Sequence, residues 1–189
     1  AWSSCKIKTD FTDEKIIIPR KSALELQKLL NLYPENVNIA FNSNQLKVFS
    51  DEYTFISKLI EGSYPDYEKV FPKGTEQKLK ANKSLVQTAL NRAAVLSNER
   101  YRGVKFILEK DNLKICANNP SKESAEEEVL VEYSGDSFEI GFNISYVQES
   151  LSVISNNEVE FVFFGSENSC LVKNIDDESL IHVIMPMRL

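Results

Sequence analysis

The sequence predicts an α+β fold in which a β-α-β-β-β unit occurs three times, with helices on one side of antiparallel sheets. Two observations predict this fold. Three short amphipathic segments recur about 60 residues apart, a period typical of a duplicated supersecondary unit. Each segment is followed by β-like runs that are separated by turn-forming residues. Because a helix with one apolar face needs a second layer to cover it, the helices are expected to pack on the sheets.

The three amphipathic segments, 22–32, 84–98 and 145–156, are the expected helices. In the first, Leu26, Leu29 and Leu30 follow the i, i+3, i+4 spacing that gathers apolar side chains on one helix face. Each helix start offers a polar side chain that can accept the free N–H groups of the first turn. The candidate caps are Ser22, then Asn82 or Ser84, and finally Asn143 or Ser145.

Strands are expected before and after the helices. Ile16–Ile18 leads into the first helix and Phe138–Phe142 into the third, and residues 1–8 also have the character of a strand. Hairpin turns are expected at 42–44, 110–112 and 166–168, where Asn, Asp and Ser favour reversal of the chain. The other expected strands are 37–41, 46–49, 53–60, 103–108, 113–117, 129–133, 159–164, 170–175 and 180–185.

The number of units predicts the domain organisation. If two units make one domain, residues 77–189 form a complete domain, whereas residues 1–73 hold one unit, which is half a domain. Pro72–Thr75 is the expected linker, because Pro and Gly interrupt regular structure. Since the first strand-like run has no turn before it, we expect the chain to be a fragment of a longer protein.

Composition and charge argue against several classes of protein. The net charge of −6 argues against a surface that binds nucleic acid throughout, so contact with DNA needs a local positive surface. No apolar run approaches the length of a membrane helix, and no association with a membrane is expected. The cysteines, Cys5, Cys116 and Cys170, are odd in number and widely spaced, which favours reduced thiols in a cytoplasm.

No catalytic, cofactor-binding or metal-binding constellation is expected. The lone histidine, His182, alternates with apolar residues in a strand and is expected to face solvent. The sequence contains no glycine-rich phosphate loop and no CxxC pair. Asp176–Glu178 is interpreted as a solvated turn, and Glu126–Glu128 as a solvated loop edge or an acidic docking patch.

Several short stretches, each weakly specific alone, occur together in one order. They are 16–21 (IIIPRK), 58–67 (KLIEGSYPDY), 92–104 (RAAVLSNERYRGV), 117–120 (ANNP), 133–135 (YSG), 140–147 (IGFNISYV) and 185–189 (MPMRL). In these stretches the chain resembles the bacterial DNA polymerase III beta subunits, which are DNA sliding clamps. The resemblance covers nearly the whole chain.

The resemblance implies the DNA-clamp fold and a function without catalysis. Clamps of this family are DNA polymerase processivity factors with three two-unit domains per subunit, and two subunits close head to tail around double-stranded DNA. This chain would carry the second half of the middle domain and the whole last domain. It would be cytoplasmic and associated with the bacterial nucleoid. The alternative is a non-catalytic peptide-binding module of the same fold that does not encircle DNA.

The resemblance also implies a cleft that binds short linear motifs. The expected partners are the alpha subunit of DNA polymerase III, clamp-loader subunits, and other polymerases and repair proteins. Lys69 stands where arginine is usual and Tyr101 where phenylalanine is, which would alter peptide preference. The matching cleft residues are Pro65, Val70, Asn143, Tyr146, Ser169, Val183, Ile184, Met185, Pro186, Met187, Arg188 and Leu189.

Two further surfaces are expected. A sliding ring should contact phosphates rather than bases, so Lys and Arg on helices are candidates, with a solvated helix face as the alternative. The DNA-facing candidates are Arg20, Lys21, Lys28, Lys83 and Arg92. By resemblance, an apolar pair flanked by acids forms the subunit contact, with core packing as the alternative for the apolar pair. These candidates are Val95, Leu96, Glu123, Glu126 and Glu127.

Overall fold

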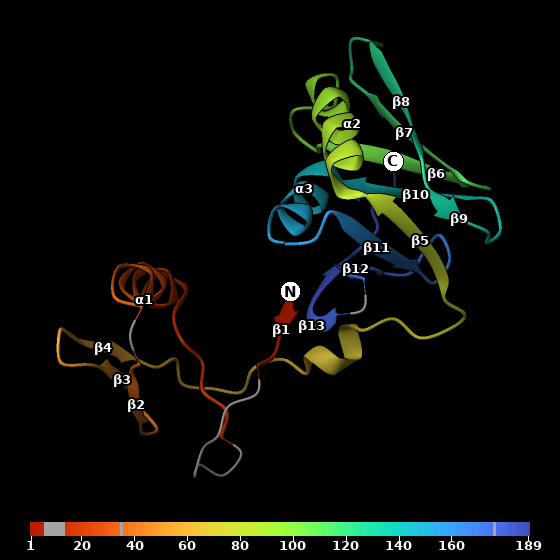
Figure 1. Ribbon diagram of the computed structural model, residues 1–189. Coiled ribbons are helices and arrows are strands. Elements are labelled where there is room, and N and C mark those ends of the chain that lie inside the picture. Colours follow the sequence, from red (N-terminus) through yellow and green to blue (C-terminus); the bar gives the residue numbers. More distant parts are fainter. Residues whose placement is uncertain (6–13, 35, 176) are drawn as a thin grey trace. The chain divides into compact units, whose positions relative to one another are not determined.

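The chain forms two compact units (Figure 1). The computed structural model describes residues 1–5, 14–34, 36–175 and 177–189. The large unit holds residues 1–6 and 68–189, and the small unit holds residues 7–67. Two sequence predictions fall partly outside the described residues, namely the end of the expected strand 1–8 and Asp176 of the acidic turn.

The large unit contains two successive copies of the predicted β-α-β-β-β repeat. The first copy is β5 (Gln77–Asn82), α2 (Lys83–Val95), β6 (Gly103–Glu109), β7 (Asn112–Asn118) and β8 (Ser124–Leu130), and β9 (Glu132–Tyr133) follows it. The second copy is β10 (Phe138–Asn143), α3 (Ile144–Ser152), β11 (Glu158–Phe163), β12 (Cys170–Asn174) and β13 (Asp177–Ile184). The predicted fold class is therefore confirmed.

Each repeat of the large unit gives its first strand to the sheet of the other repeat. β10 pairs antiparallel with β6, so one sheet has the order β10-β6-β7-β8. β5 pairs antiparallel with β11, and the other sheet has the order β1-β13-β12-β11-β5-β9, in which β1 is Trp2–Ser3. Because both sheets contain strands from both repeats, the two repeats share one core.

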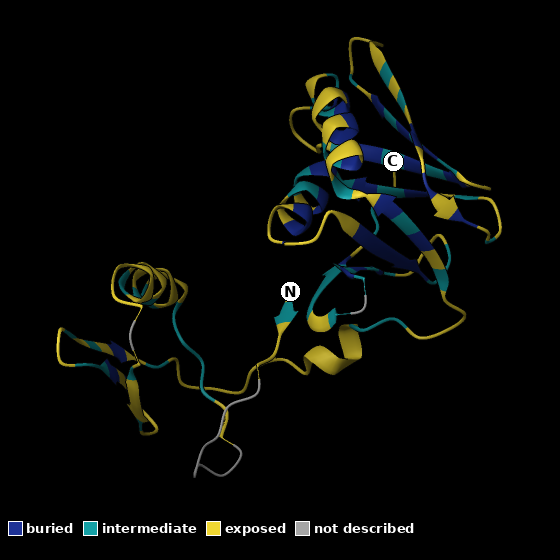
Figure 2. Cartoon of the chain, in the orientation of Figure 1, coloured by how far each residue is buried: buried dark blue, intermediate teal, exposed yellow. Residues whose placement is uncertain are grey.

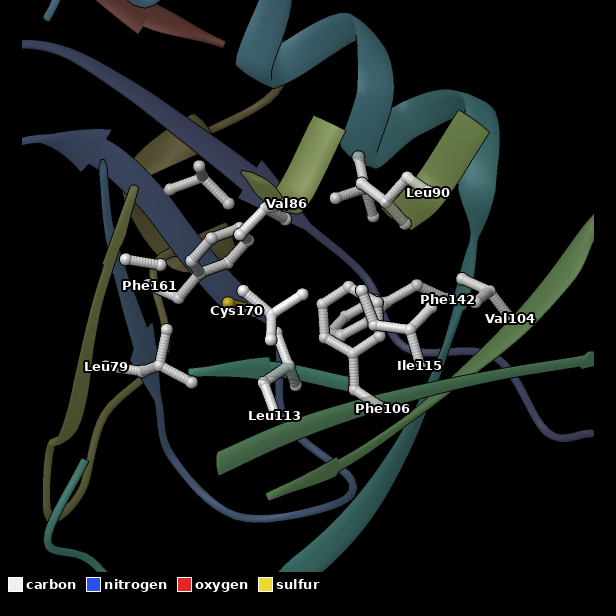
Figure 3. Close-up of a cluster of buried hydrophobic side chains, with 14 of the residues drawn as sticks. Leu79, Val86, Leu90, Val104, Phe106, Leu113, Ile115, Phe142, Phe161 and Cys170 are labelled. Carbon is white, nitrogen blue, oxygen red and sulfur yellow. The ribbon is translucent and has the colours of Figure 1, made fainter. Parts of the chain in front are cut away.

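The core lies between the two sheets and the neighbouring helices α2 and α3 (Figure 3). Phe106 on β6 connects the layers, because its ring lies edge-on to those of Phe142 on β10 and Phe161 on β11. The ring centroids are 5.4 and 6.3 Å apart, respectively. α2 presents Val86 and Leu90 to the same core, and both side chains are fully buried. Removal of these apolar side chains from water stabilises the fold.

Asparagine side chains start both helices of the large unit. Asn82 Oδ1 accepts a hydrogen bond from Leu85 N (3.2 Å), and Asn143 Oδ1 accepts one from Ser145 N (2.9 Å). Each asparagine also ends the strand before its helix, so strand and helix meet without a loop. Of the alternatives in the sequence, Asn82 and Asn143 are therefore the caps.

In its described residues, the small unit contains one copy of the repeat without the first strand. It consists of α1 (Arg20–Leu32) and an antiparallel sheet of order β2-β3-β4, with β2 at Asn38–Phe41, β3 at Gln45–Phe49 and β4 at Thr54–Lys58. A short 3-10 helix, η1 (Tyr67–Val70), follows along the chain. Among the described residues of this unit, only Leu46, Val48 and Ser57 are buried (Figure 2).

Two predictions for the small unit are wrong. Ile16–Ile18, although described, forms no strand, and Ile17 O accepts a backbone hydrogen bond from Ile60 N (2.9 Å). This run lies just before α1, in the place that β5 has before α2 and β10 has before α3. Both β5 and β10 pair with a strand of the other repeat. Ser22 is not the helix cap either, because α1 already begins at Arg20, after Pro19.

Two predictions for the large unit are wrong as well. Glu126–Glu128 lies within β8, at the edge of its sheet, rather than in a loop. His182 is half-buried rather than solvent-facing, because it pairs with the buried Val172. Ile181 and Val183, its apolar neighbours, point to the outer face of the sheet. The alternation of polar and apolar residues predicts the strand correctly, but the face that carries His182 is the inner face of the sheet.

Candidate partner-binding and DNA-facing surfaces

The C-terminal segment (Met185–Leu189) leaves β13 of one sheet and lies against β10 and β6 of the other. Met187 N donates a hydrogen bond to Gly141 O on β10 (2.9 Å). Successive residues of a strand alternate between the two faces of a sheet, and both Gly141 and Gly103 are on the outer face. Leu189 lies over both glycines. The segment therefore connects the two sheets of the large unit.

Asn143 and Tyr146, two of the predicted cleft residues, lie where β10 passes into α3. Besides capping α3, Asn143 donates a long hydrogen bond from Nδ2 to Tyr101 O (3.4 Å). Asn143 is on the same face of β10 as Gly141, the face that the C-terminal segment covers. Tyr146 lies in the first turn of α3 and is 59% exposed. Its flat ring and polar tip are therefore accessible to a ligand.

Other predicted cleft residues lie at the end of β13 and beside it. Val183 is half-buried on the outer face, and Ser169 is half-buried just before β12. Ile184 pairs with Cys170 and is buried, so it anchors the C-terminal segment in the core rather than presenting a surface. Met185, the next residue, is 68% exposed. Its flexible thioether suits apolar ligands of varied shape.

Val70 and Pro65 are both exposed. Val70 ends η1 in the large unit, whereas Pro65 belongs to the small unit. That these two residues and the C-terminal segment form one cleft stays a prediction.

Two hollows flank the C-terminal segment, with volumes of about 740 and 480 Å³. The larger hollow extends over Ile107 of β6 and Cys116 of β7. The smaller one lies beside Glu139 of β10. Four residues line both hollows: Lys105 of β6 and Met187, Arg188 and Leu189, so the segment forms the ridge between them.

The basic residues of α1 are the more accessible candidates for DNA contact. Arg20 and Lys21 are exposed at the start of the helix. Lys28 is also exposed, and its Nζ pairs with Glu25 at 3.0 Å, one turn away. Exposed pairs of this kind contribute little to stability, so the Lys28 ammonium can exchange its partner for a phosphate at low cost.

The basic residues of α2 are engaged within the large unit. Lys83 Nζ donates a hydrogen bond to Ile154 O (2.7 Å). Arg92 forms two hydrogen bonds with the Glu127 carboxylate on β8, one of them from Nε to Oε1 at 2.8 Å. This bonding raises the pKa of Arg92 and lowers the pKa of Glu127. Arg92 therefore offers little free positive charge to DNA.

The apolar pair of the predicted subunit contact lies at the end of α2. Val95 is 78% exposed and Leu96 is half-buried. The core residues of α2 are Val86, Ala89, Leu90 and Ala93, so core packing does not account for Val95. Val95 is thus available to a partner surface.

The acidic residues of the predicted subunit contact lie on β8 and the turn before it. Glu126 pairs with Lys114 at 2.8 Å, and Glu123 accepts a hydrogen bond from Asn119 (2.6 Å). β8 is an edge strand of its sheet. The backbone groups on the open side of an edge strand are available to pair with another chain.

Two features of these surfaces were not predicted from the sequence. The first is that Gly103 and Gly141 support the C-terminal segment, although a glycine inside a strand is a known sign of close approach by another chain segment. The second is the pairing of Arg92 with Glu127, which are far apart in the sequence. No local pattern marks that pair.

Two titratable side chains of the large unit, His182 and Cys170, have pKa values shifted by burial. Burial lowers the pKa of His182 and raises that of the Cys170 thiol, so each group is held in its neutral form. The three cysteines are free. In the described ranges, no group of three or more His, Cys, Asp and Glu is arranged to hold a metal ion, and no helix is long and apolar enough to cross a membrane.

Paired repeats with exchanged strands, helices on one side and an exposed C-terminal segment define a clamp-type domain. Residues 1–66 match the central domain of the DNA polymerase III beta subunit, and residues 68–188 match its C-terminal domain. The chain belongs to the DNA polymerase III beta-subunit family, as the sequence resemblance predicted.

Individual relatives agree with this assignment. The chain is 43% identical to the beta sliding clamp of Pseudomonas aeruginosa over 175 residues, which are 93% of the chain and 48% of the relative. It is 38% identical to the beta sliding clamp of Escherichia coli K12 over 189 residues, which are 100% of the chain and 52% of the relative. The chain thus spans about half the length of these relatives.

Solved structures show the same fold. The crystal structure of the P. aeruginosa subunit has a TM-score of 0.89 at 43% identity and covers 92% of the chain and 48% of that structure's chain. The sliding clamp of Caulobacter crescentus has a TM-score of 0.86 at 30% identity, with 92% and 46% covered. Another structure contains the P. aeruginosa clamp bound to griselimycin.

Proposed function

We propose that this chain is part of a non-catalytic processivity factor, a sliding clamp that encircles double-stranded DNA. The observation that carries the proposal is the match of residues 1–66 and 68–188, in that order, to the central and C-terminal domains of the beta subunit. In this proposal, two full-length subunits close head to tail in the bacterial cytoplasm. They tether the DNA polymerase III alpha subunit, clamp-loader subunits, and other polymerases and repair proteins.

A clamp of this kind acts by tethering, because a polymerase held on a ring has a high effective concentration at the DNA. Sliding requires attraction to phosphates without contacts that select bases. Arg20 and Lys21 fit this requirement, whereas Arg92 is already paired with Glu127. α3 carries no Lys or Arg, and its exposed Glu149 adds negative charge. The attraction to DNA is therefore assigned mainly to α1.

The partner cleft is assigned to the surface around the C-terminal segment. Tyr146 and Met185 are exposed there, and both are side chains suited to varied apolar peptide groups. The segment itself is anchored by the buried Ile184 and by the hydrogen bond from Met187 to Gly141. This arrangement combines a fixed backbone with accessible side chains, which lowers the entropy lost on binding.

The subunit contact is assigned to β8 and the end of α2. The open edge of β8 can accept a strand from a second subunit, and the exposed Val95 can add an apolar contact. The acidic residues Glu123 and Glu126 favour a basic partner face, whereas Glu127 is already paired with Arg92. We expect that the 189-residue chain alone does not close a ring, because that face is assigned to the first domain of the full-length subunit.

Fluorescence titration of the full-length subunit with a labelled Gln-Leu-Ser-Leu-Phe peptide tests the partner cleft. We expect saturable binding and competition by griselimycin. Tyr146→Ala and Met185→Ala should each weaken binding about tenfold, as truncation of an interface anchor does. Val153→Ala, at an exposed residue just after α3, is the control and should leave the affinity unchanged. Absence of binding by the full-length subunit would reject the cleft.

Measuring how long the protein stays on DNA distinguishes a sliding clamp from a peptide-binding module that does not encircle DNA. After loading, the full-length subunit should stay on circular DNA and be lost from linear DNA, because a ring slides off a free end. Equal retention on both templates would contradict topological tethering. Peptide binding without any retention would support the module that does not encircle DNA.

A further inference from the structure

Gly103 and Gly141 form a seat for the C-terminal segment. A Cβ atom added to Gly141 would overlap Met187 O and would lie 2.8 Å from Leu189 Cγ. A Cβ atom added to Gly103 would overlap Leu189 Cδ2. Atoms in contact are normally about 3.5–4.0 Å apart, so a side chain at Gly141 requires the segment backbone to move, whereas one at Gly103 requires the end of the Leu189 side chain to move.

Backbone conformation does not explain these two glycines. The described glycines with positive φ are Gly62, Gly74 and Gly165, and neither Gly103 nor Gly141 is among them. Both lie in regular antiparallel strands, where a side chain is ordinarily allowed and favourable. What excludes a side chain is the close approach of the C-terminal segment.

The seat fixes the middle and the end of the segment. Upstream, Ile184 is buried in the core, and Met185 then leaves the sheet exposed. Met187 is held by its N–H bond to Gly141 O. Leu189 lies over Gly103 and Gly141 with no room beneath it. The missing side chain at Gly141 therefore lets the Met187 backbone lie close to the sheet, and the missing side chain at Gly103 leaves room for the end of Leu189.

We infer that Gly103 and Gly141 are positioning residues. Because they lack side chains, the C-terminal segment can lie as close to the sheet as the partner cleft requires. This inference rests on the cleft assigned above. The two glycines do not touch the peptide in this arrangement. They act through Met187 and Leu189, which line the two hollows beside the segment.

The two glycines should differ in effect. A methyl group at Gly141 meets the Met187 backbone, which is tied to the same glycine by a hydrogen bond and cannot rotate away. At Gly103 a methyl group meets only the end of the Leu189 side chain, and the next nearest atom, Leu189 Cγ, is 3.7 Å away. Gly141→Ala should therefore lift the segment, whereas Gly103→Ala should displace only the Leu189 side chain.

The test compares Gly141→Ala with Glu109→Ala in the full-length subunit. Glu109 is exposed on the same outer face of the neighbouring strand β6 and lines neither hollow, which makes it the matched control. Two quantities are measured: affinity for the labelled Gln-Leu-Ser-Leu-Phe peptide, and hydrogen exchange of the Met187 amide. Gly141→Ala should weaken peptide binding and speed Met187 exchange, each by about tenfold or more. Glu109→Ala should change neither.

Shortening Leu189 tests the seat from the other side. Gly103→Ala should weaken binding by a few-fold, and the double variant Gly103→Ala, Leu189→Ala should bind no worse than Leu189→Ala alone, because the overlap is gone. Additive losses in the double variant would contradict a seat for Leu189. This cycle does not depend on Gly141→Ala being well folded.

The outcomes also separate this inference from the proposed cleft. If the unchanged subunit binds no peptide, the cleft is wrong and Met187 exchange alone reports on the seat. If the subunit binds peptide and Gly141→Ala speeds Met187 exchange without weakening binding, the positioning role is overturned and the cleft stands. Equal losses of affinity in Gly141→Ala and Glu109→Ala would also overturn it.

Discussion

Helices α1 and α2 occupy equivalent positions of the same repeat and both have 13 residues, but they are buried to very different extents. Leu90 on α2 is 0% exposed, whereas Leu30, which has the corresponding place in the i, i+3, i+4 apolar spacing of α1, is 36% exposed. No residue of α1 is buried, although its apolar residues are as regularly spaced as those of α2. Both helices therefore have an apolar face, but only the apolar face of α2 is buried.

The sheets explain the difference. In the large unit, β5 and β10 cross to the sheet of the other repeat, and both helices pack on a shared core. The described part of the small unit has three strands and one helix from a single repeat. The sequence of one repeat is thus enough to form an amphipathic helix, whereas burial of the apolar face of that helix requires a second repeat.

The largest expected effect comes from breaking the shared core. Phe106→Ala should lower the free energy of unfolding by about 3–5 kcal/mol, because it removes the ring that connects β6 with β10 and β11. Urea unfolding followed by circular dichroism measures it. Ile107→Ala, on the opposite face of the same strand, is the control and should cost clearly less. Equal losses would mean that Phe106 does not connect the layers.

Truncation of equivalent leucines tests the comparison of the helices directly. Leu90→Ala should cost about 2–5 kcal/mol, whereas Leu30→Ala should cost under about 1 kcal/mol, because Leu30 leaves little cavity. The same unfolding measurement applies to both variants. A loss for Leu30→Ala as large as that for Leu90→Ala would show that α1 is covered as well as α2.

Helix caps should show a smaller contrast. Asn82→Ala should cost about 1 kcal/mol, since it removes the acceptor for Leu85 N at the start of α2. Ser22→Ala should leave stability unchanged, because α1 begins before Ser22. A measurable loss for Ser22→Ala would contradict the observed start of α1.

The smallest effect is expected from the exposed pair of Arg92 and Glu127. The hydrogen bonds from Arg92 lower the pKa of Glu127, so their stabilisation is complete above the ordinary carboxylate pKa and is lost as pH falls through the lowered value. Glu127→Gln should remove this part of the acid dependence. Unfolding of both forms across the acidic range checks it, and identical profiles would show that the pair contributes nothing.

The parts of the fold that depend on local sequence could be predicted. The apolar spacing of Val86, Ala89 and Leu90 located α2, and the expected turn at 42–44 is observed, with Asn42 Oδ1 accepting a hydrogen bond from Asn44 N (2.8 Å). The parts that depend on pairing could not be predicted. The face of β13 that carries His182 is buried by the packing of its sheet on the core, and no local pattern in Ile16–Ile18 shows that this run forms no strand.

The candidate site shows the same division. Without the family resemblance, the residues Met185–Leu189 would be interpreted as a mobile end of the chain. Their anchoring requires Ile184 in the core and two glycines from different strands, which only the fold brings together. A glycine in a strand indicates that another segment comes close, but not which one.

The strand exchange also constrains how the large unit is made on the ribosome. β5 is synthesised early, but its partner β11 follows only after the whole first repeat, β10 and α3. Until then β5 can pair only with the two-residue strand β9, and the apolar face of α2 is incompletely covered. Pairings between strands so distant in sequence form slowly and leave apolar surface open to aggregation. The domain can therefore complete its fold only after nearly all of it has been released, rather than one repeat at a time.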